Sequence, residues 1–128
     1  ARPGQFQPEL WRYDLAEWFM AAGDGTNYWE FNLAPNGAWW ACAFSDTRRA
    51  NEDIPAPLAV DTKCILTDEG WCAMARIPLN ELRGIRDCKL AATFILDTPD
   101  QIFLTTADDL SGNPDFHRPD CFCTPILK

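Results

Sequence analysis

His117 is the only histidine in the chain, and Cys121 and Cys123 follow it closely. The three residues form a His-x3-Cys-x-Cys arrangement. Structural zinc sites use two well-separated pairs of ligands, and this spacing is not one of theirs. His117 could instead bind a haem iron together with Met20 or Met74. Both methionines alternate with apolar neighbours, which favours packing in the core, so haem is not a cofactor that we expect.

Carboxylates are the second group that could carry chemistry, because the chain has 19 acidic residues. Pairs such as Asp14 with Glu17, or Asp108 with Asp109, could serve in glycoside hydrolysis. Carboxylates of an acidic protein are usually solvated, however, and no nucleophile motif or phosphate-binding loop is present. We therefore expect no enzymatic activity. Calcium stays an open alternative, since carboxylates in loops suit this ion. The candidate calcium ligands are Asp24, Asp46, Asp53, Asp68, Asp97 and Asp100.

Aromatic residues are the most suggestive feature, at 12% of the chain with six Trp. Such rings stack on the apolar faces of sugars, while polar groups beside them bind the hydroxyls. Trp29, Trp39 and Trp71 each share a strand face with apolar neighbours, so we expect them in the core. Trp11 lies between Glu9 and Arg12, outside any alternating pattern. Trp11 is therefore our candidate for lining a binding site.

The chain has 128 residues, 47% of them apolar, and a formal net charge of -8. This length suits one domain with a real core, and the apolar fraction excludes general disorder. The negative charge argues against nucleic acid or anionic lipid as a partner. No apolar run approaches the roughly 20 residues of a membrane-spanning helix.

Six cysteines leave the redox state open, because their number allows disulfides and their setting favours burial. Cys42, Cys64 and Cys72 lie within apolar runs, so we expect small buried side chains there. Cys121 and Cys123 are two residues apart on an extended segment and point to opposite faces, so they should not bond each other.

Short alternating segments separated by turn residues predict strands throughout. We expect an all-β protein, an antiparallel β-sandwich of the jelly-roll kind with one short helical turn. The predicted strands cover residues 15–22, 28–33, 38–44, 60–66, 71–77, 90–96, 101–106 and 122–127. The helical turn is expected at 78–83, and loops at 45–59 and 107–119.

Glu17 is unusual within this pattern, because it shares a strand face with Leu15 and Phe19. A carboxylate on an apolar face is unfavourable unless it is paired. Either an arginine pairs with it, or this face is a concave and wet binding surface. The candidate arginines are Arg48, Arg49 and Arg76.

Four segments, in order, resemble family 9 carbohydrate-binding modules and the related DOMON-like domains. Residues 10–19 are similar to a Trp-x-x-Asp-x-x-Glu-x-Phe segment, and 28–39 to Tyr-x-Glu-Phe-Asn-x-x-Pro-x-Gly-x-Trp. Residues 71–82 resemble Trp-x5-Ile-Pro-x3-Leu, and 114–122 resemble the closing segment of these domains. The likeness runs through nearly the whole chain, as one domain over 1–128.

The resemblance implies a β-sandwich that binds a terminal sugar between two aromatic rings. Here the rings would be Trp11 and Phe116, where Phe116 replaces the usual Trp. The polar contacts would match Glu17 and Asn113. Arg48 and His117 complete our set of ligand-binding candidates.

The resemblance also implies strands before the Trp-x-x-Asp segment, where this chain has ten residues. We expect that the domain lacks its N-terminal strands, or that a fused or partner chain supplies them. Two alternatives to carbohydrate binding stay open: a haem-binding DOMON-type domain and a structural or assembly domain. An extracellular or periplasmic location is expected, with a cytoplasmic one left open.

Overall fold

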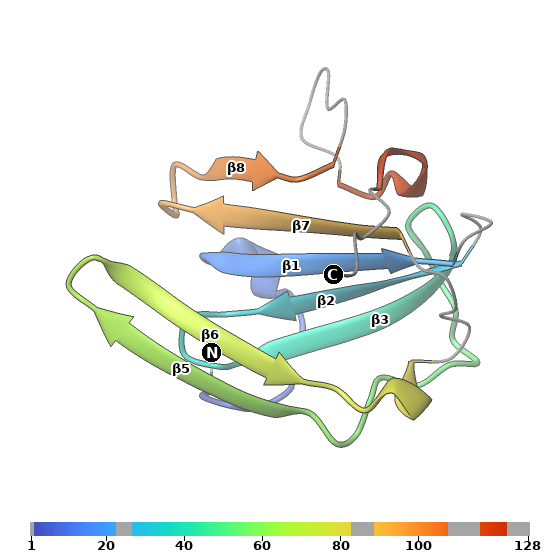
Figure 1. The fold of residues 1–128 in the computed structure, drawn as a ribbon, viewed down its shortest axis with the longest axis horizontal. Helices are drawn as coiled ribbons and strands as arrows, with labels where there is room; N and C mark the ends of the chain where they lie inside the picture. The colour runs from blue at the N-terminus through green and yellow to red at the C-terminus, as the bar shows by residue number, and fades with distance from the viewer. Residues whose placement is uncertain (1, 23–26, 83–88, 108–115, 123–128) are drawn as a thin grey trace, which may run out of the picture.

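The computed structural model describes residues 2–22, 27–82, 89–107 and 116–122, which form a six-stranded sheet and a two-stranded hairpin (Figure 1). Every pair of neighbouring strands is antiparallel, which confirms the all-β sandwich. The large sheet has the order β4-β3-β2-β1-β7-β8. Its strands are β1 (Leu15–Ala21), β2 (Tyr28–Leu33), β3 (Trp39–Asp46), β4 (Arg49–Ala50), β7 (Lys89–Leu96) and β8 (Ile102–Thr105). The hairpin consists of β5 (Asp61–Thr67) and β6 (Gly70–Arg76).

The β5–β6 hairpin is the second layer of the sandwich and crosses the sheet obliquely in front of it (Figure 1). Alternate residues of β2 and β3 point toward the hairpin, among them the buried Trp29, Phe31 and Trp39. Ala73 and Ala75 of β6 pack against this cluster. The core of the front layer thus forms because period-two alternation gives both sheets an apolar inner face.

The back face of the sheet carries two separate apolar clusters. One gathers Leu15 and Ile95 around the buried Leu10. The other gathers Phe19 and Tyr28 with further aromatic residues that include Phe116 and Phe122. Leu10, near the start of the chain, therefore covers one end of this face, and Phe116 and Phe122, near the end of the described chain, cover the other. The middle of the face carries different side chains, described below.

The described residues also contain three 3₁₀ turns, which are η1 (Leu10–Arg12), η2 (Leu79–Glu81) and η3 (Pro119–Cys121). Only η2 was predicted, at 78–83. The predicted loop at 45–59 contains the two-residue strand β4. The last predicted strand begins at Phe122, which is not in a strand, and its other residues lie outside the described ranges.

Burial of the hairpin side chains differs from the prediction. Cys64 and Cys72 are exposed free thiols, and Met74 is 56% exposed. The predictions of burial at these three positions are wrong, because the hairpin has one sheet beneath it and solvent above. Trp29 and Trp39 are buried as predicted.

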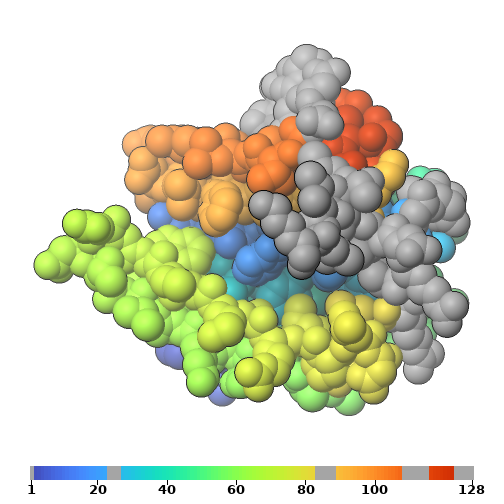
Figure 2. Space-filling model, in the orientation of Figure 1, coloured from blue at the N-terminus to red at the C-terminus, as the bar shows by residue number. Residues whose placement is uncertain are grey.

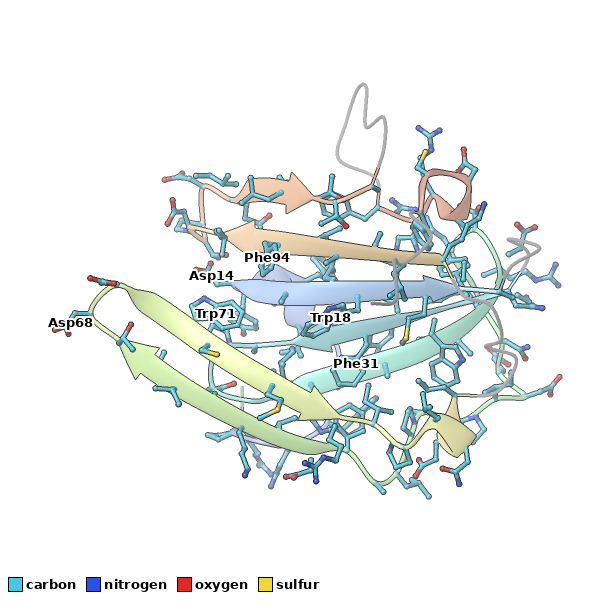
Figure 3. All side chains as sticks on the ribbon, viewed as in Figure 1. Asp14, Trp18, Phe31, Asp68, Trp71 and Phe94 are labelled. Atoms are coloured by element: carbon cyan, nitrogen blue, oxygen red, sulfur yellow. The ribbon has the colours of Figure 1, made fainter. Side chains whose placement is uncertain are left out.

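A hollow lies on the front face, between β6 of the hairpin and strands β1, β2 and β7 of the sheet (Figure 2). It is an apolar pocket of about 320 Å³ whose lining includes Trp18, Phe31 and Met74. Trp18 and Phe31 both point toward the viewer in Figure 3. The two-stranded second layer covers this face only in part, since Phe94 is 37% exposed.

Within the described residues, no helix has the length and apolar character needed to span a membrane.

Candidate functional site

Four polar side chains are buried in the described part of the chain, and they share the back face of the sheet. They are Glu17, Glu30, Asn32 and Thr93. Glu17 of β1 lies directly opposite Asn32 of β2 on one side and Thr93 of β7 on the other. Residues opposite each other on neighbouring strands share a face, so these side chains form one polar row across three strands.

Glu17 and Asn32 of this row, together with Glu30, form the floor of a pocket of about 660 Å³, called the polar pocket. The row separates the two apolar clusters of the back face, because Glu17 alternates with Leu15 of one and Phe19 of the other. Aromatic rings form the walls of the pocket; they are Trp11, Phe19, Trp40, Phe44, Phe103 and Phe116. A ligand in this pocket would therefore lie between aromatic rings and in contact with carboxylates.

Trp11 reaches the rim of the polar pocket from η1 and is 54% exposed. The fully buried Leu10 anchors η1 in the sandwich. The Gln101 side-chain amide donates a hydrogen bond to the Trp11 carbonyl over 3.2 Å. Arg12 lies 5.1 Å from the centre of the Trp11 ring and pairs with Glu9 at 3.1 Å. The hydrogen bond from Gln101 and the contact with Arg12 therefore position the Trp11 ring at the rim while it stays half exposed.

A chain of hydrogen bonds runs from the β3–β4 turn to the floor of the polar pocket. The Arg48 backbone N–H donates to the Tyr28 hydroxyl at 2.9 Å, and this hydroxyl lies 2.9 Å from His117 Nδ1. His117 Nε2 lies 3.2 Å from Glu30 Oε2, and Asn32 Nδ2 donates to Glu30 Oε1 at 2.9 Å. The Tyr28 hydroxyl can donate to His117 Nδ1 while it accepts from the Arg48 N–H, and we assign this tautomer of His117. His117 then donates from Nε2 to Glu30.

The two buried glutamates of the floor have raised pKa values. Burial, and then the nearby charge of Glu17, raise the pKa of Glu30 to about 8, against the opposing effects of Asn32 and Arg48. Burial also raises the pKa of Glu17, although the Thr93 hydroxyl, which donates to it at 2.7 Å, opposes the shift. The floor therefore binds protons at pH values where solvated carboxylates do not.

Cys42 lies opposite Glu30 on the neighbouring strand. Burial, followed by the charge of Glu30, raises the pKa of its thiol to about 11. Since the thiolate is the nucleophilic form of cysteine, Cys42 is unsuited to nucleophilic chemistry near neutral pH.

Five of the six predicted ligand-binding residues line the polar pocket. They are Trp11, Glu17, Arg48, Phe116 and His117. The sixth, Asn113, lies outside the described residues. Phe116 is only 9% exposed and packs on Phe103 with a centroid separation of 6.0 Å, so it is mostly core. The two predicted stacking rings therefore differ, with Trp11 open to solvent and Phe116 largely covered.

An arginine partner was one of the two alternatives predicted for Glu17, and the hydrogen bond that the structure shows comes from the Thr93 hydroxyl instead. The other alternative, a binding surface on that face, stays a prediction. Sequence reasoning also missed Glu30, Asn32 and Tyr28 as part of the site. Glu30 carried a weaker signal than Glu17, because its neighbours on the same strand face are Tyr28 and the polar Asn32. Thr93 carried no such signal, because a threonine in a strand is ordinary.

The geometry bears on the metal and haem alternatives. Among the described residues, no three His, Cys, Asp or Glu side chains come together in a way that could hold a metal ion. Both ring nitrogens of His117 already have partners, so binding of iron by Nε2 would break its contact with Glu30. Met20 lines the apolar pocket on the opposite face of the sheet from His117.

Comparison of the chain with models of protein families, with curated proteins and with solved structures gives no match. The likeness to carbohydrate-binding modules and DOMON-like domains stays a prediction from the sequence.

Proposed function

We propose that the protein is a non-catalytic carbohydrate-binding module and that the polar pocket is its sugar site. The observation that supports this most is the buried polar floor of Glu17, Glu30 and Asn32 among aromatic walls. A sugar presents apolar C–H faces and a ring of hydroxyls, so it needs rings and hydrogen-bonding groups at once. The resemblance of four sequence segments to sugar-binding modules supports the same proposal.

One atom of the floor supports a polar ligand in particular. Asn32 is 1% exposed, and its Oδ1 is a buried acceptor that has no hydrogen-bond partner among the residues that the structure describes. A buried polar atom left unpaired destabilises a fold by about 1–3 kcal/mol. A sugar hydroxyl in the polar pocket would supply the missing donor.

Titration calorimetry against neutral mono- and oligosaccharides tests the proposal. We expect at least one sugar to bind, and Trp11→Ala to weaken that binding by about tenfold through loss of stacking. The variant should keep its free energy of unfolding within about 0.5 kcal/mol, because the ring is half exposed. Tyr13→Ala is the matched control, since Tyr13 is 49% exposed and is not part of the pocket lining.

A folded protein that binds none of these sugars would contradict the proposal. Release of reducing ends during the titration would replace it with glycoside hydrolysis, for which Glu17 and Glu30 would be the acid and base candidates. Binding that Tyr13→Ala weakens as much as Trp11→Ala would place the site away from the pocket.

The partly covered front face supports a second candidate, an assembly domain whose sandwich a partner chain completes. Phe94, Ile102 and Leu104 on β7 and β8 are 37%, 50% and 50% exposed. Exposed apolar surface on an edge strand favours pairing with another chain. Light scattering decides this candidate: a complex supports it, and a monomer at high concentration contradicts it.

A further inference from the structure

The floor of the polar pocket holds a buried hydrogen-bond acceptor that no donor of the described residues reaches. Glu30 accepts from Asn32 at one oxygen and lies against His117 at the other. Glu17 accepts from Thr93 through Oε2. Asn32 turns its amide hydrogens to Glu30, which leaves Oδ1 as the unpaired acceptor. The Asn32 amide and the Thr93 hydroxyl thus donate within the floor, and Asn32 Oδ1 remains an acceptor without a donor among the described residues.

The charged residues of the pocket lining come from five places in the fold, whereas β7 and β8 contribute only the apolar Ile95 and Phe103. Glu9 lies just before η1, Glu17 on β1, Glu30 on β2, Arg48 after β3 and His117 before η3. Glu9 is paired with Arg12, and Arg48 opposes the raised pKa of Glu30. Carboxylates outnumber cations in the lining, in a chain whose net charge is -8.

A hydroxyl both donates and accepts hydrogen bonds, whereas an ammonium group only donates. A floor with an unpaired acceptor therefore suits an ammonium better than a hydroxyl. Asn32 lies directly opposite Glu17 on the neighbouring strand, so the unpaired oxygen and a carboxylate are adjacent. Hydrogen bonds between charged groups are also stronger than those between neutral groups.

We propose that the sugar bound by the polar pocket is an amino sugar, whose free ammonium group is held by Asn32 Oδ1 and the Glu17 carboxylate. This inference rests on the proposed function and names its ligand class. The ammonium would supply the missing donor to Asn32 and a counter-charge to the buried glutamates. An N-acetylated amino sugar lacks that charge and would bind like a neutral sugar.

Three trisaccharides with the same β-1,4 linkage provide the test: cellotriose, N-acetylated chitotriose and the fully deacetylated glucosamine trimer. Calorimetry at neutral pH and about 0.15 M salt limits long-range attraction between the acidic protein and the cationic trimer. We expect the glucosamine trimer to bind about tenfold more tightly than the other two. Glu17→Gln should remove most of that preference, and Glu69→Gln, an equal charge change at the exposed hairpin turn, should keep it.

Proton release is a second measurement that needs no variant. A bound cation favours the ionised form of a nearby carboxylate, so the buried glutamates should release protons when the glucosamine trimer binds. Calorimetry in two buffers of different ionisation enthalpy, at a mildly acidic pH where the amino groups of the trimer are already protonated, should show this release for the glucosamine trimer and not for cellotriose.

The outcomes separate the two proposals. Equal binding of cellotriose and the glucosamine trimer, or a preference that Glu17→Gln keeps, overturns the amino-sugar inference and leaves sugar binding intact. Binding of the glucosamine trimer without proton release also overturns it. If none of the trisaccharides or the neutral sugars binds, the proposed function itself fails.

Discussion

At the residue scale, the site depends on side chains that hold one another in place. Tyr28 lies between the Arg48 backbone and His117, and His117 lies between Tyr28 and Glu30. Each member is fixed by its neighbour, so the floor of the polar pocket is organised before any ligand arrives. Such a floor would contribute to affinity by reducing the ordering that binding requires.

The first prediction concerns the hydroxyl of Tyr28, which is 1% exposed. Tyr28→Phe removes a partner from both Arg48 N–H and His117 Nδ1, so the free energy of unfolding should fall by about 1–3 kcal/mol. Urea unfolding measures this loss. Tyr13→Phe makes the same chemical change at an exposed ring and should be neutral within about 0.5 kcal/mol. Equal effects of the two substitutions would show that the hydrogen-bond chain adds nothing to stability.

At the element scale, the hairpin is attached to the sheet through the β2–β3 turn. Gly37 in this turn has a φ of 85°, a conformation that favours glycine. The Thr62 hydroxyl of β5 donates to the Gly37 carbonyl at 2.9 Å. A Cβ at position 37 would lie 3.0 Å from the Thr62 Oγ1. The turn and the hairpin therefore fit only with glycine at this position.

The second prediction follows for Gly37→Ala. Backbone strain and crowding against Thr62 should together lower the free energy of unfolding by at least about 1–2 kcal/mol. In a Thr62→Ala background the same substitution should cost less, because only the backbone strain is left. A thermal or urea double-mutant cycle measures the difference. Strictly additive effects would contradict the contact between turn and hairpin.

At the scale of the whole molecule, the buried glutamates couple stability to pH. The ordinary pKa of Glu30 is 4.5, and the fold raises it to about 8. Between these values the folded state holds a proton that the unfolded state has lost. The free energy of unfolding is therefore highest below the lower value, falls as the pH rises and levels off above the higher one.

The third prediction is a loss of stability from about pH 5 to pH 8, with a slope of at most about 1.4 kcal/mol per pH unit from Glu30. Glu30→Gln should flatten this slope, whereas Glu69→Gln should not. Asp14 acts in a different range, because its bond from Thr98 lowers its pKa below 3.8. A series of urea titrations across this pH range gives the slope. A wild-type curve as flat as that of Glu30→Gln would contradict the assignment.

The sequence predicted the fold class because two-residue alternation and turn residues directly encode strands. It predicted Trp11 and Glu17 because each breaks the local pattern. It could not predict that Thr93 is the partner of Glu17, since the pairing of β1 with β7 joins residues 76 positions apart. The exposure of Cys64 and Cys72 could not be predicted either, because it depends on the hairpin having a sheet on one side and solvent on the other.

The most direct test of sugar binding in the polar pocket is an NMR titration of the tryptophan indole N–H signals. The chain has six tryptophans, of which Trp11 and Trp40 line the polar pocket and Trp18 lines the apolar pocket on the other face. With the tightest-binding sugar, we predict shifts of the Trp11 and Trp40 signals while the Trp18 signal stays in place. Shifts at Trp18 without shifts at Trp11 and Trp40, or no shift at saturating sugar, would contradict the account.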